Sequence, residues 1–346
     1  MSLNIKQKEK IIKASVFTKT IKILLVNLIV FLILFELGSR SFLSLRRDAS
    51  FFDPSSVTLF YYPEMKSTLA QPPSAENWDI LLLGASVLNP AWGEVEKELK
   101  ELLSQFGKKI VIHNLAIPAH TTRDSLIKYR LLRDYKFDKV FVYHGINELR
   151  LNNYPIYHYR QDYSHIHWYR TVNLFSLHSE LSYIATPFFL KHAWTKITCP
   201  DNDEQYEDKQ HGDNLKTAEA FYDNLSKISE LASQKDEDLI LATYAFHLPD
   251  DYNIDAFESK SLSYNGHRLP VEAWGLPKHV QHGLLVHNDK ISQIAAEKKL
   301  TCVKINKKIV GEATNFDDIC HLTSEGSRLF AEILVPHLSP NHSLND

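Results

Sequence analysis

The feature that most constrains the fold of this chain is a regular alternation of strand-like and helix-like segments, which begins near residue 78. The strand-like segments are short, continuous apolar runs such as WDILLLGAS at residues 78–86, and such runs are typical of strands buried on both faces of a sheet. Four more follow, at residues 109–116, 139–145, 238–244 and 301–306. Segments with helical spacing lie between or after them, at residues 93–107, 121–135, 218–235, 284–299 and 324–334. Strands that alternate with helices pair in parallel, so we expect an α/β fold in which helices cover a mostly parallel sheet.

Two long segments interrupt this alternation, at residues 151–212 and 246–278. Both are rich in aromatic and polar residues and show no clear period. Each follows a predicted strand, so each should begin at the carboxyl edge of the sheet, where the ligands of open α/β folds bind. Long insertions in a compact domain are usually functional loops or disordered segments. We therefore expect one main domain, residues 78–340, that carries both insertions.

An apolar stretch near the N-terminus, residues 21–37, lies at the lower edge of the length that crosses a bilayer as a helix. Lys22 and Glu36 lie near its ends, where long side chains reach the headgroups. A cleavable signal peptide would need small residues at its cleavage site, and LGSRS is a poor match. The other alternative is a buried core helix. The position of the stretch, next to a lysine-rich tail near the N-terminus, argues against it. We predict an uncleaved transmembrane signal anchor.

Charges on the two sides of this stretch predict its orientation. The tail at residues 1–20 contains five lysines and one acid, so by the positive-inside rule it stays in the cytoplasm. The main domain, joined to the anchor by a linker at residues 38–77, then lies outside the cytoplasmic membrane. Three arginines follow the apolar stretch on its C-terminal side, and their positive charge weakens the prediction that this side is outside: Arg40, Arg46 and Arg47.

Charge and cysteine content argue against several other classes of protein. The net charge is -3, and Lys and Arg are dispersed beyond the N-terminal tail, so nucleic-acid binding is not expected. The three cysteines, Cys199, Cys302 and Cys320, form no CxxC pair, which argues against a zinc ribbon or a dense disulfide framework, although one disulfide remains open. The sequence lacks GxGxxG, Walker A and GxSxG patterns. We predict neither a cofactor nor a metal.

Polar side chains with catalytic chemistry follow the predicted strands. Ser86 comes directly after the first strand, and Asn147 follows the third in HGINE. Asp318 and His321 follow the last strand in DDICH. Because the carboxyl ends of parallel strands meet at one edge of the sheet, all four side chains can converge on one crevice.

These residue types suit acyl transfer. A serine hydroxyl is a weak nucleophile and needs a base, which neutral His321 would supply. Asp318 would accept the other imidazole N–H and fix the tautomer. The Asn147 side chain and the Ser86 backbone N–H could donate to the developing oxyanion. Taken singly, each residue has a simpler explanation, since Ser86 or Asn147 could be a turn residue and Asp318 with His321 could belong to a helix entry.

Four sequence blocks, ILLLGAS, NLAIPAHTT, GINE and DDICHLTSEG, together resemble the SGNH (GDSL-like) hydrolase superfamily in order and over most of residues 78–338. This resemblance implies a flavodoxin-like three-layer α/β sandwich. It also implies that Ser86 is the nucleophile, that Asp318-x-x-His321 completes the triad, and that the backbone N–H near Ala119 joins Asn147 in the oxyanion hole.

The blocks depart from the family pattern at three positions. Ala85 replaces the Asp of GDS proteins, and Glu148 follows Asn147 where the family has Asp. Ala119 stands where the family's oxyanion glycine would fall. An alanine strongly disfavours positive φ, so a hole that needs this conformation would suffer.

Aromatic residues of the first insertion are the best candidates for substrate contact. Tyr, His and Trp offer flat faces and hydrogen-bonding edges that suit sugar rings, although a lid that packs its own aromatics is equally open. We expect substrate contacts from Tyr154, Tyr157 and Trp168, and from His247 after the fourth strand.

These features predict a membrane-anchored serine esterase that removes an acyl group, with acetyl as one candidate, from a carbohydrate outside the cytoplasmic membrane. A lipid esterase or thioesterase is an alternative that needs a long apolar acyl channel. An acyltransferase could use the same triad. A catalytically weak polysaccharide-binding or assembly protein could retain the scaffold. The sequence does not predict an oligomeric state.

Overall fold

The computed structural model describes residues 5–47, 50–52, 56–177, 184–198 and 215–340. The chain forms two compact units. The first consists of Met1–Tyr61 and His178–Thr198, and the second of Tyr62–Leu177 and Cys199–Asp346. The second unit contains the sheet.

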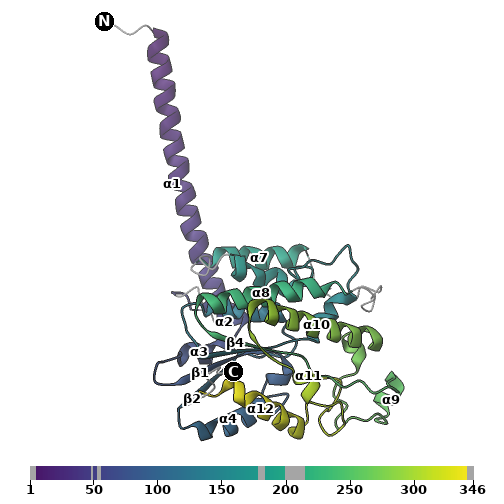
Figure 1. Cartoon of the computed structure of the whole chain (residues 1–346). Coiled ribbons are helices and arrows are strands. Elements are labelled where there is room, and N and C mark those ends of the chain that lie inside the picture. The colour runs from purple at the N-terminus through teal and green to yellow at the C-terminus, as the bar shows by residue number, and fades with distance from the viewer. Residues whose placement is uncertain (1–4, 48–49, 53–55, 178–183, 199–214, 341–346) are drawn as a thin grey trace. The chain divides into compact units, whose positions relative to one another are not determined.

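Five parallel strands form this sheet, in the order β2-β1-β3-β4-β5 (Figure 1). Their bounds are β1 Trp78–Gly84, β2 Ile110–Asn114, β3 Lys139–Tyr143, β4 Asp238–Ala242 and β5 Thr301–Val303. Every adjacent pair is parallel, and Leu82 of β1 lies opposite Asn114 on one side and Phe141 on the other. All five strands fall within the segments predicted for them, and the predicted parallel α/β sheet is confirmed.

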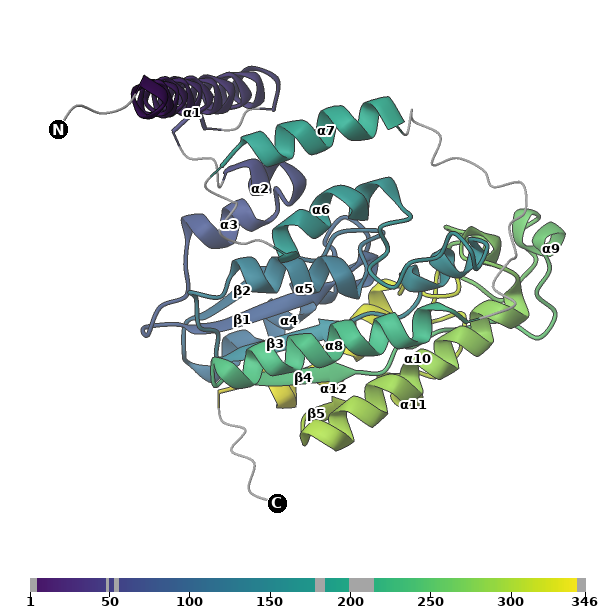
Figure 2. The same cartoon turned by 90° about the horizontal axis from the view of Figure 1, so that it is seen from above.

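Helices cover both faces of the sheet and make the three predicted layers. One layer contains α5 Thr122–Leu131, α8 Thr217–Gln234 and α10 Pro277–Lys298. The opposite layer contains α4 Val95–Leu103 and α12 Ser324–Leu338, which pack against each other (Figures 1 and 2). The short α11, Ile305–Lys308, follows β5. Strand side chains such as Ile80, Leu82 and Val140 are buried between the layers, which explains the continuous apolar runs.

The segments predicted as insertions and linker contain more regular structure than expected. The first insertion holds the end of η3 Asn147–Asn153, together with α6 His167–Leu177 and α7 Thr186–Thr198. The second holds α9 Ile254–Glu258 and η5 Val271–Ala273. The predicted linker at residues 38–77 holds the end of α1 and two short helices, α2 Ser56–Tyr61 and α3 Met65–Ala70. Sequence periodicity missed these elements because most of them are too short to show it.

The first unit contains the N-terminal helix α1, which spans Ile5–Arg47 and is much longer than the predicted stretch at residues 21–37. Among the described residues, its part Val16–Arg46 is the one helix long and apolar enough to cross a membrane. Its side chains are exposed from Val16 to Leu34, as a lipid-facing helix requires.

Candidate active site

The order of the strands places two of the predicted residues at one point of the sheet. After β1 the chain moves to β2 on one side, and β3 lies on the other side, so the carboxyl ends of β1 and β3 flank a topological switch point. Ser86 begins the turn η1 Ser86–Leu88 directly after β1, and Asn147 begins η3 after β3. Both side chains therefore start from the edge where ligands of such folds bind.

A short closed loop brings the other two residues to Ser86. Phe316 and Leu322 form an antiparallel bridge, and the N–H of Asp317 donates to the carbonyl oxygen of His321 over 2.8 Å. The loop is followed at once by α12, whose N-cap Thr323 accepts the N–H of Gly326. Bridge and cap together fix where the side chain of His321 points.

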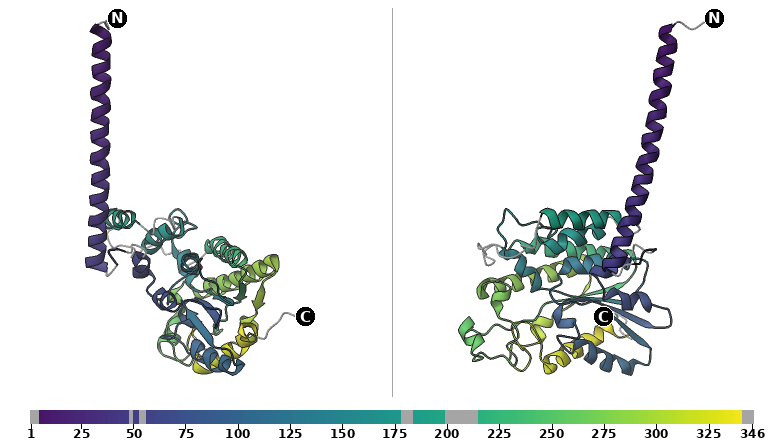
Figure 3. Two further views of the ribbon diagram at one scale, coloured as in Figure 1. Left: turned by 90° about the vertical axis from the view of Figure 1, so that its left-hand side faces the viewer. Right: turned by 180° about the vertical axis from the view of Figure 1, so that it is seen from behind.

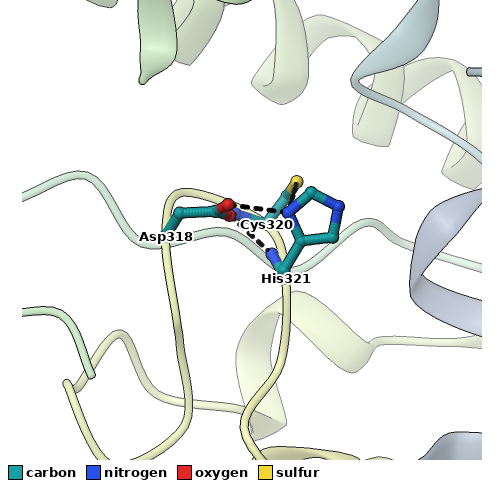
Figure 4. Close-up of side chains that lie close together, drawn as sticks. All are labelled: Asp318, Cys320 and His321. Atoms are coloured by element: carbon teal, nitrogen blue, oxygen red, sulfur yellow. Dashed lines mark hydrogen bonds and ion pairs between the residues drawn. The ribbon is translucent and has the colours of Figure 1, made fainter. Parts of the chain in front are cut away.

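Ser86, His321 and Asp318 form a continuous hydrogen-bonded series. His321 Nε2 lies 2.9 Å from Ser86 Oγ, and His321 Nδ1 lies 2.7 Å from Asp318 Oδ2. Figure 4 shows the carboxylate facing the imidazole. Because the carboxylate is an acceptor, we assign the Nδ1 proton to this bond, which leaves Nε2 free to accept from the serine hydroxyl. Asp318 is fully buried and His321 is 1% exposed, so little water competes for these bonds.

Backbone N–H groups hold the Asp318 carboxylate in place. Its Oδ1 accepts from the N–H groups of Cys320 and His321, and its Oδ2 accepts from Leu269. The neighbouring Asp317 instead pairs with Arg268, with 2.8 Å between Oδ2 and Nη2. Asp318 is therefore the carboxylate that orients the imidazole, as its spacing from His321 predicts.

Two tryptophans that the sequence analysis did not connect to the site flank the imidazole. The Trp92 ring lies 4.8 Å from the His321 ring, measured between centroids, and the Trp274 ring lies 6.5 Å away. Trp274 comes from the second insertion, and no local pattern links either tryptophan to His321. Their rings limit the access of water to the histidine and restrict its rotation.

Ala119 adopts a left-handed backbone conformation that alanine disfavours, with φ of 70°. This conformation costs an alanine roughly 1–2 kcal/mol, so neighbouring contacts must hold it. Arg150 Nη2 donates to the carbonyl oxygen of Ala119 over 3.0 Å, and Asn147 Nδ2 donates to that of His120 over 3.0 Å. Within the described part of the chain, the N–H of Ala119 has no hydrogen-bond partner.

The side-chain amide of Asn147 is oriented from both ends. Its Oδ1 accepts from Trp274 Nε1 at 3.3 Å, while one N–H goes to His120 as described above. An amide nitrogen has two N–H groups, so one remains for a ligand. Asn147 is 5% exposed and thus lies at the edge of the interior.

A pocket of about 380 Å³ adjoins Ala119. Two of the predicted contact residues, Tyr154 and Trp168, line it. The remaining lining residues come from the Ala119 loop, η3 and the first insertion: Ala119, His120, Thr121, Arg150, Leu151, Ile166 and Tyr169. Tyr157 does not line this pocket and is 65% exposed, and His247 points to the carbonyl oxygen of Ser263, 3.2 Å from its Nε2.

The buried Asp124 connects the aromatic wall of the pocket to the Ala119 loop. It accepts hydrogen bonds from Trp168 Nε1 at 2.8 Å, from the Tyr169 hydroxyl at 2.6 Å and from the N–H of Thr121 at 2.9 Å. Burial opposes ionisation of this carboxyl, but His120 and these hydrogen bonds outweigh it and lower the pKa of Asp124 to about 2. The sequence predicts Asp124 only as part of a helix, so this role was missed.

Two further buried groups adjoin the Ala119 loop. Burial lowers the pKa of His120 to about 4, so its ring is neutral near pH 7. Burial also raises the pKa of Glu148 to about 7. Glu148 accepts the N–H of Thr122 through Oε1, while its buried Oε2 has no hydrogen-bond partner among the residues that the structure describes. Glu148 thus supports the start of α5.

Asp318, Cys320 and His321 are the one group among the described residues with metal-ligand spacing, their ligand atoms all lying within 4.8 Å of one another (Figure 4). The His321 nitrogen and the Asp318 carboxylate already bond to each other. Burial raises the pKa of Cys320 well above its usual value, and a neutral thiol is a poor metal ligand. These donors do not fit a metal. Cys302 and Cys320 are free thiols, and Cys199 lies outside the described residues.

Similar solved structures include a GDSL-like lipase from Bacteroides thetaiotaomicron, at 14% identity and a TM-score of 0.44, which covers 80% of this chain and 96% of that chain. An acetylxylan esterase from Geobacillus stearothermophilus has 14% identity and a TM-score of 0.41, over 77% of this chain and 94% of that chain. An α/β hydrolase from the metagenome of Lake Arreo in Spain has 12% identity and a TM-score of 0.43, over 77% of this chain and 96% of that chain. No family model and no curated protein matches the chain. Likeness at this level assigns neither an activity nor a substrate to this protein.

Proposed function

We propose that this protein is a serine esterase that cleaves an acyl ester on a carbohydrate. The observation that carries the proposal is the series Ser86 Oγ, His321 Nε2, His321 Nδ1 and Asp318 Oδ2, with links of 2.9 Å and 2.7 Å. A serine at a strand end needs no such arrangement for folding. A nucleophile needs both a base and a group that orients the base.

In the proposed acylation step, Ser86 Oγ attacks the ester carbonyl carbon while His321 Nε2 takes the hydroxyl proton. Asp318 stabilises the imidazolium that forms. The carbonyl oxygen becomes negative and accepts hydrogen bonds from the N–H groups of Ser86 and Ala119 and from the free N–H of Asn147. His321 then gives its proton to the leaving alkoxide, and the acyl group stays on Ser86.

In the proposed deacylation step, water takes the place of the alcohol. His321 removes a proton from the water as its oxygen attacks the acyl carbon of the Ser86 ester. The second tetrahedral intermediate uses the same donors, and its collapse returns the proton to Ser86 Oγ and releases the carboxylic acid. Replacing water by a sugar hydroxyl would make the same steps an acyl transfer.

The pocket beside Ala119 supports a small substrate with a ring. Its volume of about 380 Å³ lies near the lower end of the range of roughly 300–1,000 Å³ for small-molecule sites. Tyr154 and Trp168 offer aromatic faces of the kind that stack on sugar rings. A volume of this size favours a short acyl group such as acetyl over a long lipid chain. With the N-terminal helix as an anchor, the ester would lie outside the cytoplasmic membrane.

Labelling with a serine-reactive fluorophosphonate tests this proposal. We expect the wild type to be labelled and Ser86→Ala to remain unlabelled, whereas Ser226→Ala, a matched substitution on α8, should be labelled like the wild type. Equal labelling of the wild type and Ser86→Ala would contradict the proposal. Comparing acetyl with long-chain nitrophenyl esters then separates a short-acyl esterase from a lipid esterase.

A further inference from the structure

A carboxylate of the N-terminal helix caps a helix of the first insertion. Glu36 of α1 accepts the backbone N–H of Ala185 through Oε1 at 2.9 Å and that of Thr186 through Oε2 at 2.9 Å. The first N–H groups of a helix have no partners within it, so these two bonds satisfy two donors at the N-terminus of α7. Arg40, one turn further along α1, donates to Glu36 Oε1 at 2.7 Å. The acidic residue near the end of the apolar stretch therefore serves to attach α7.

Aromatic packing makes the same attachment along the side of α7. The Phe189 ring meets Phe35 edge to face at 5.9 Å and Phe42 at 5.2 Å. Phe188 and Ala185 are 2% and 1% exposed. One side of α7 is thus buried, and its position relative to α1 is fixed by the capping bonds and the ring contacts.

The attachment sets the height of α7 along α1. The apolar stretch at residues 21–37 is the part of α1 predicted to cross the bilayer, and burial of its side chains begins at Phe35, where α7 docks. At about 1.5 Å per residue these 17 residues span about 26 Å, near the hydrocarbon thickness of roughly 30 Å. The capping carboxylate of Glu36 lies at the end of this stretch, so α7 is held at the level where the hydrocarbon would end.

The direction of α7 fits the same level. Figures 1 and 3 show α7 running across the axis of α1 near its C-terminal end. A helix that crosses the axis of a membrane-spanning helix lies roughly parallel to the membrane plane. Its length of 13 residues, about 20 Å at 1.5 Å per residue, would then rest on the bilayer surface.

Large apolar side chains of α7 remain exposed on the side away from this packing. Leu190 is 51% exposed, and Trp194, one turn further on and on the same stripe, is 64% exposed. Ile184, just before the helix, is 43% exposed. Tryptophan and leucine on one face are typical of helices that lie in the membrane interface.

We propose that α7 is an interfacial helix that lies in the headgroup region of the bilayer crossed by α1, with Leu190 and Trp194 in contact with phospholipid. The occupant of the exposed face is lipid because α1 and α7 form one attached pair, and the attachment holds that face where the apolar stretch ends. The first insertion then has two parts with different structural roles. Its residues up to α6 line the pocket, and α7 joins the anchor.

Fluorescence quenching by brominated lipid tests this inference on the full-length chain. The protein is reconstituted into liposomes of phosphatidylcholine and phosphatidylglycerol that carry bromine near the glycerol end of the acyl chains. We expect the tryptophan fluorescence of the wild type to be lower in brominated liposomes than in unbrominated ones. Trp194→Phe should show less than half of that loss. Trp78→Phe, at a half-buried tryptophan of β1, is the matched control and should keep the full loss.

Three outcomes would overturn the proposal. The first is a loss of the same size in Trp194→Phe and wild type, which is also expected if the exposed face of α7 pairs with a second copy of the chain. The second is stronger quenching of Trp194 by bromine near the chain ends than near the glycerol, because α7 would then lie inside the hydrocarbon. The third is failure of the protein to float with liposomes, which would overturn the anchor as well. None of these readouts depends on esterase activity.

Discussion

Ser86 follows β1 and Ala119 follows the neighbouring β2, yet the two parts of the site are held in different ways. Ser86 meets a base and an orienting carboxylate that lie three residues apart in one closed loop. The Ala119 loop has a backbone conformation that its own side chain disfavours, and it is held by Asn147 and Arg150 of η3. The loop is tied further by Asp124.

This difference separates chemistry from support. The nucleophile side depends on groups that act directly on the proposed reacting atoms. The Ala119 side depends on hydrogen bonds that join segments far apart in the sequence. Substitutions on the nucleophile side should therefore abolish turnover, whereas those around Ala119 should reduce the rate more moderately or change stability.

The largest effect is expected from His321→Gln, which removes the base but leaves the Ala119 loop intact. We expect kcat for a nitrophenyl acetate to fall by about 10⁶-fold, as loss of the base does in comparable serine hydrolases. KM should change little. Steady-state kinetics check this, and a fall of less than about tenfold would show that His321 is not the base.

Asn147→Ala should have the next largest effect. It removes the proposed side-chain donor to the oxyanion and also the bond that holds the His120 carbonyl oxygen. Removing one such donor typically lowers kcat by about 10²–10³-fold. Asn306→Ala, on α11 and bonded to Thr243, is the matched control and should stay near the wild-type rate. A wild-type kcat in Asn147→Ala would show that the Asn147 side chain does not donate to the oxyanion.

Glu148→Gln should change the pH dependence of stability rather than the chemistry. Burial raises the pKa of Glu148 from the ordinary value of 4.5 to about 7, so the folded protein keeps a proton that the unfolded chain releases. The wild type should therefore lose stability relative to Glu148→Gln as pH rises from about 4.5 to about 7, by roughly 3 kcal/mol. Urea unfolding of both proteins across this range measures the difference. A gap that stays constant with pH would contradict the raised pKa.

The smallest effect is expected from Ala119→Gly. Glycine adopts positive φ without the steric cost of roughly 1–2 kcal/mol that alanine has. Glycine also gives the unfolded chain more conformational freedom, which lowers the free energy of unfolding by about 0.4–1 kcal/mol. We expect a gain in stability of about 1 kcal/mol or less and nearly unchanged kcat. Thermal unfolding and kinetics check this. A clear loss of stability would show that Ala119 is not strained.

The parts of the site that follow strand ends could be predicted from the sequence. Ser86 and Asn147 come directly after apolar runs, and Asp318 and His321 have the spacing of a carboxylate and its imidazole. The conformation of Ala119 could not be predicted, because it depends on donors from η3. Trp92 and Trp274 were missed for the same reason, since only the fold brings them to His321.

The same limit applies to the N-terminal helix. Its apolar stretch predicts a span, but Glu36 looked like a residue that reaches toward the headgroups. Only the structure connects it to Ala185 and Thr186, about 150 positions further along the chain. Patterns within a segment predict what that segment forms, and they do not predict which distant backbone groups it will satisfy.

The most direct test of the central proposal is the covalent acyl-enzyme. The full-length protein is exposed briefly to a nitrophenyl acetate, quenched in acid, and analysed as an intact protein and as peptides by mass spectrometry. We predict one acetyl group on the peptide that contains Ser86 and none on this peptide in Ser86→Ala. An acetyl group found only on other residues, or an adduct that persists in Ser86→Ala, would contradict a serine esterase built on Ser86.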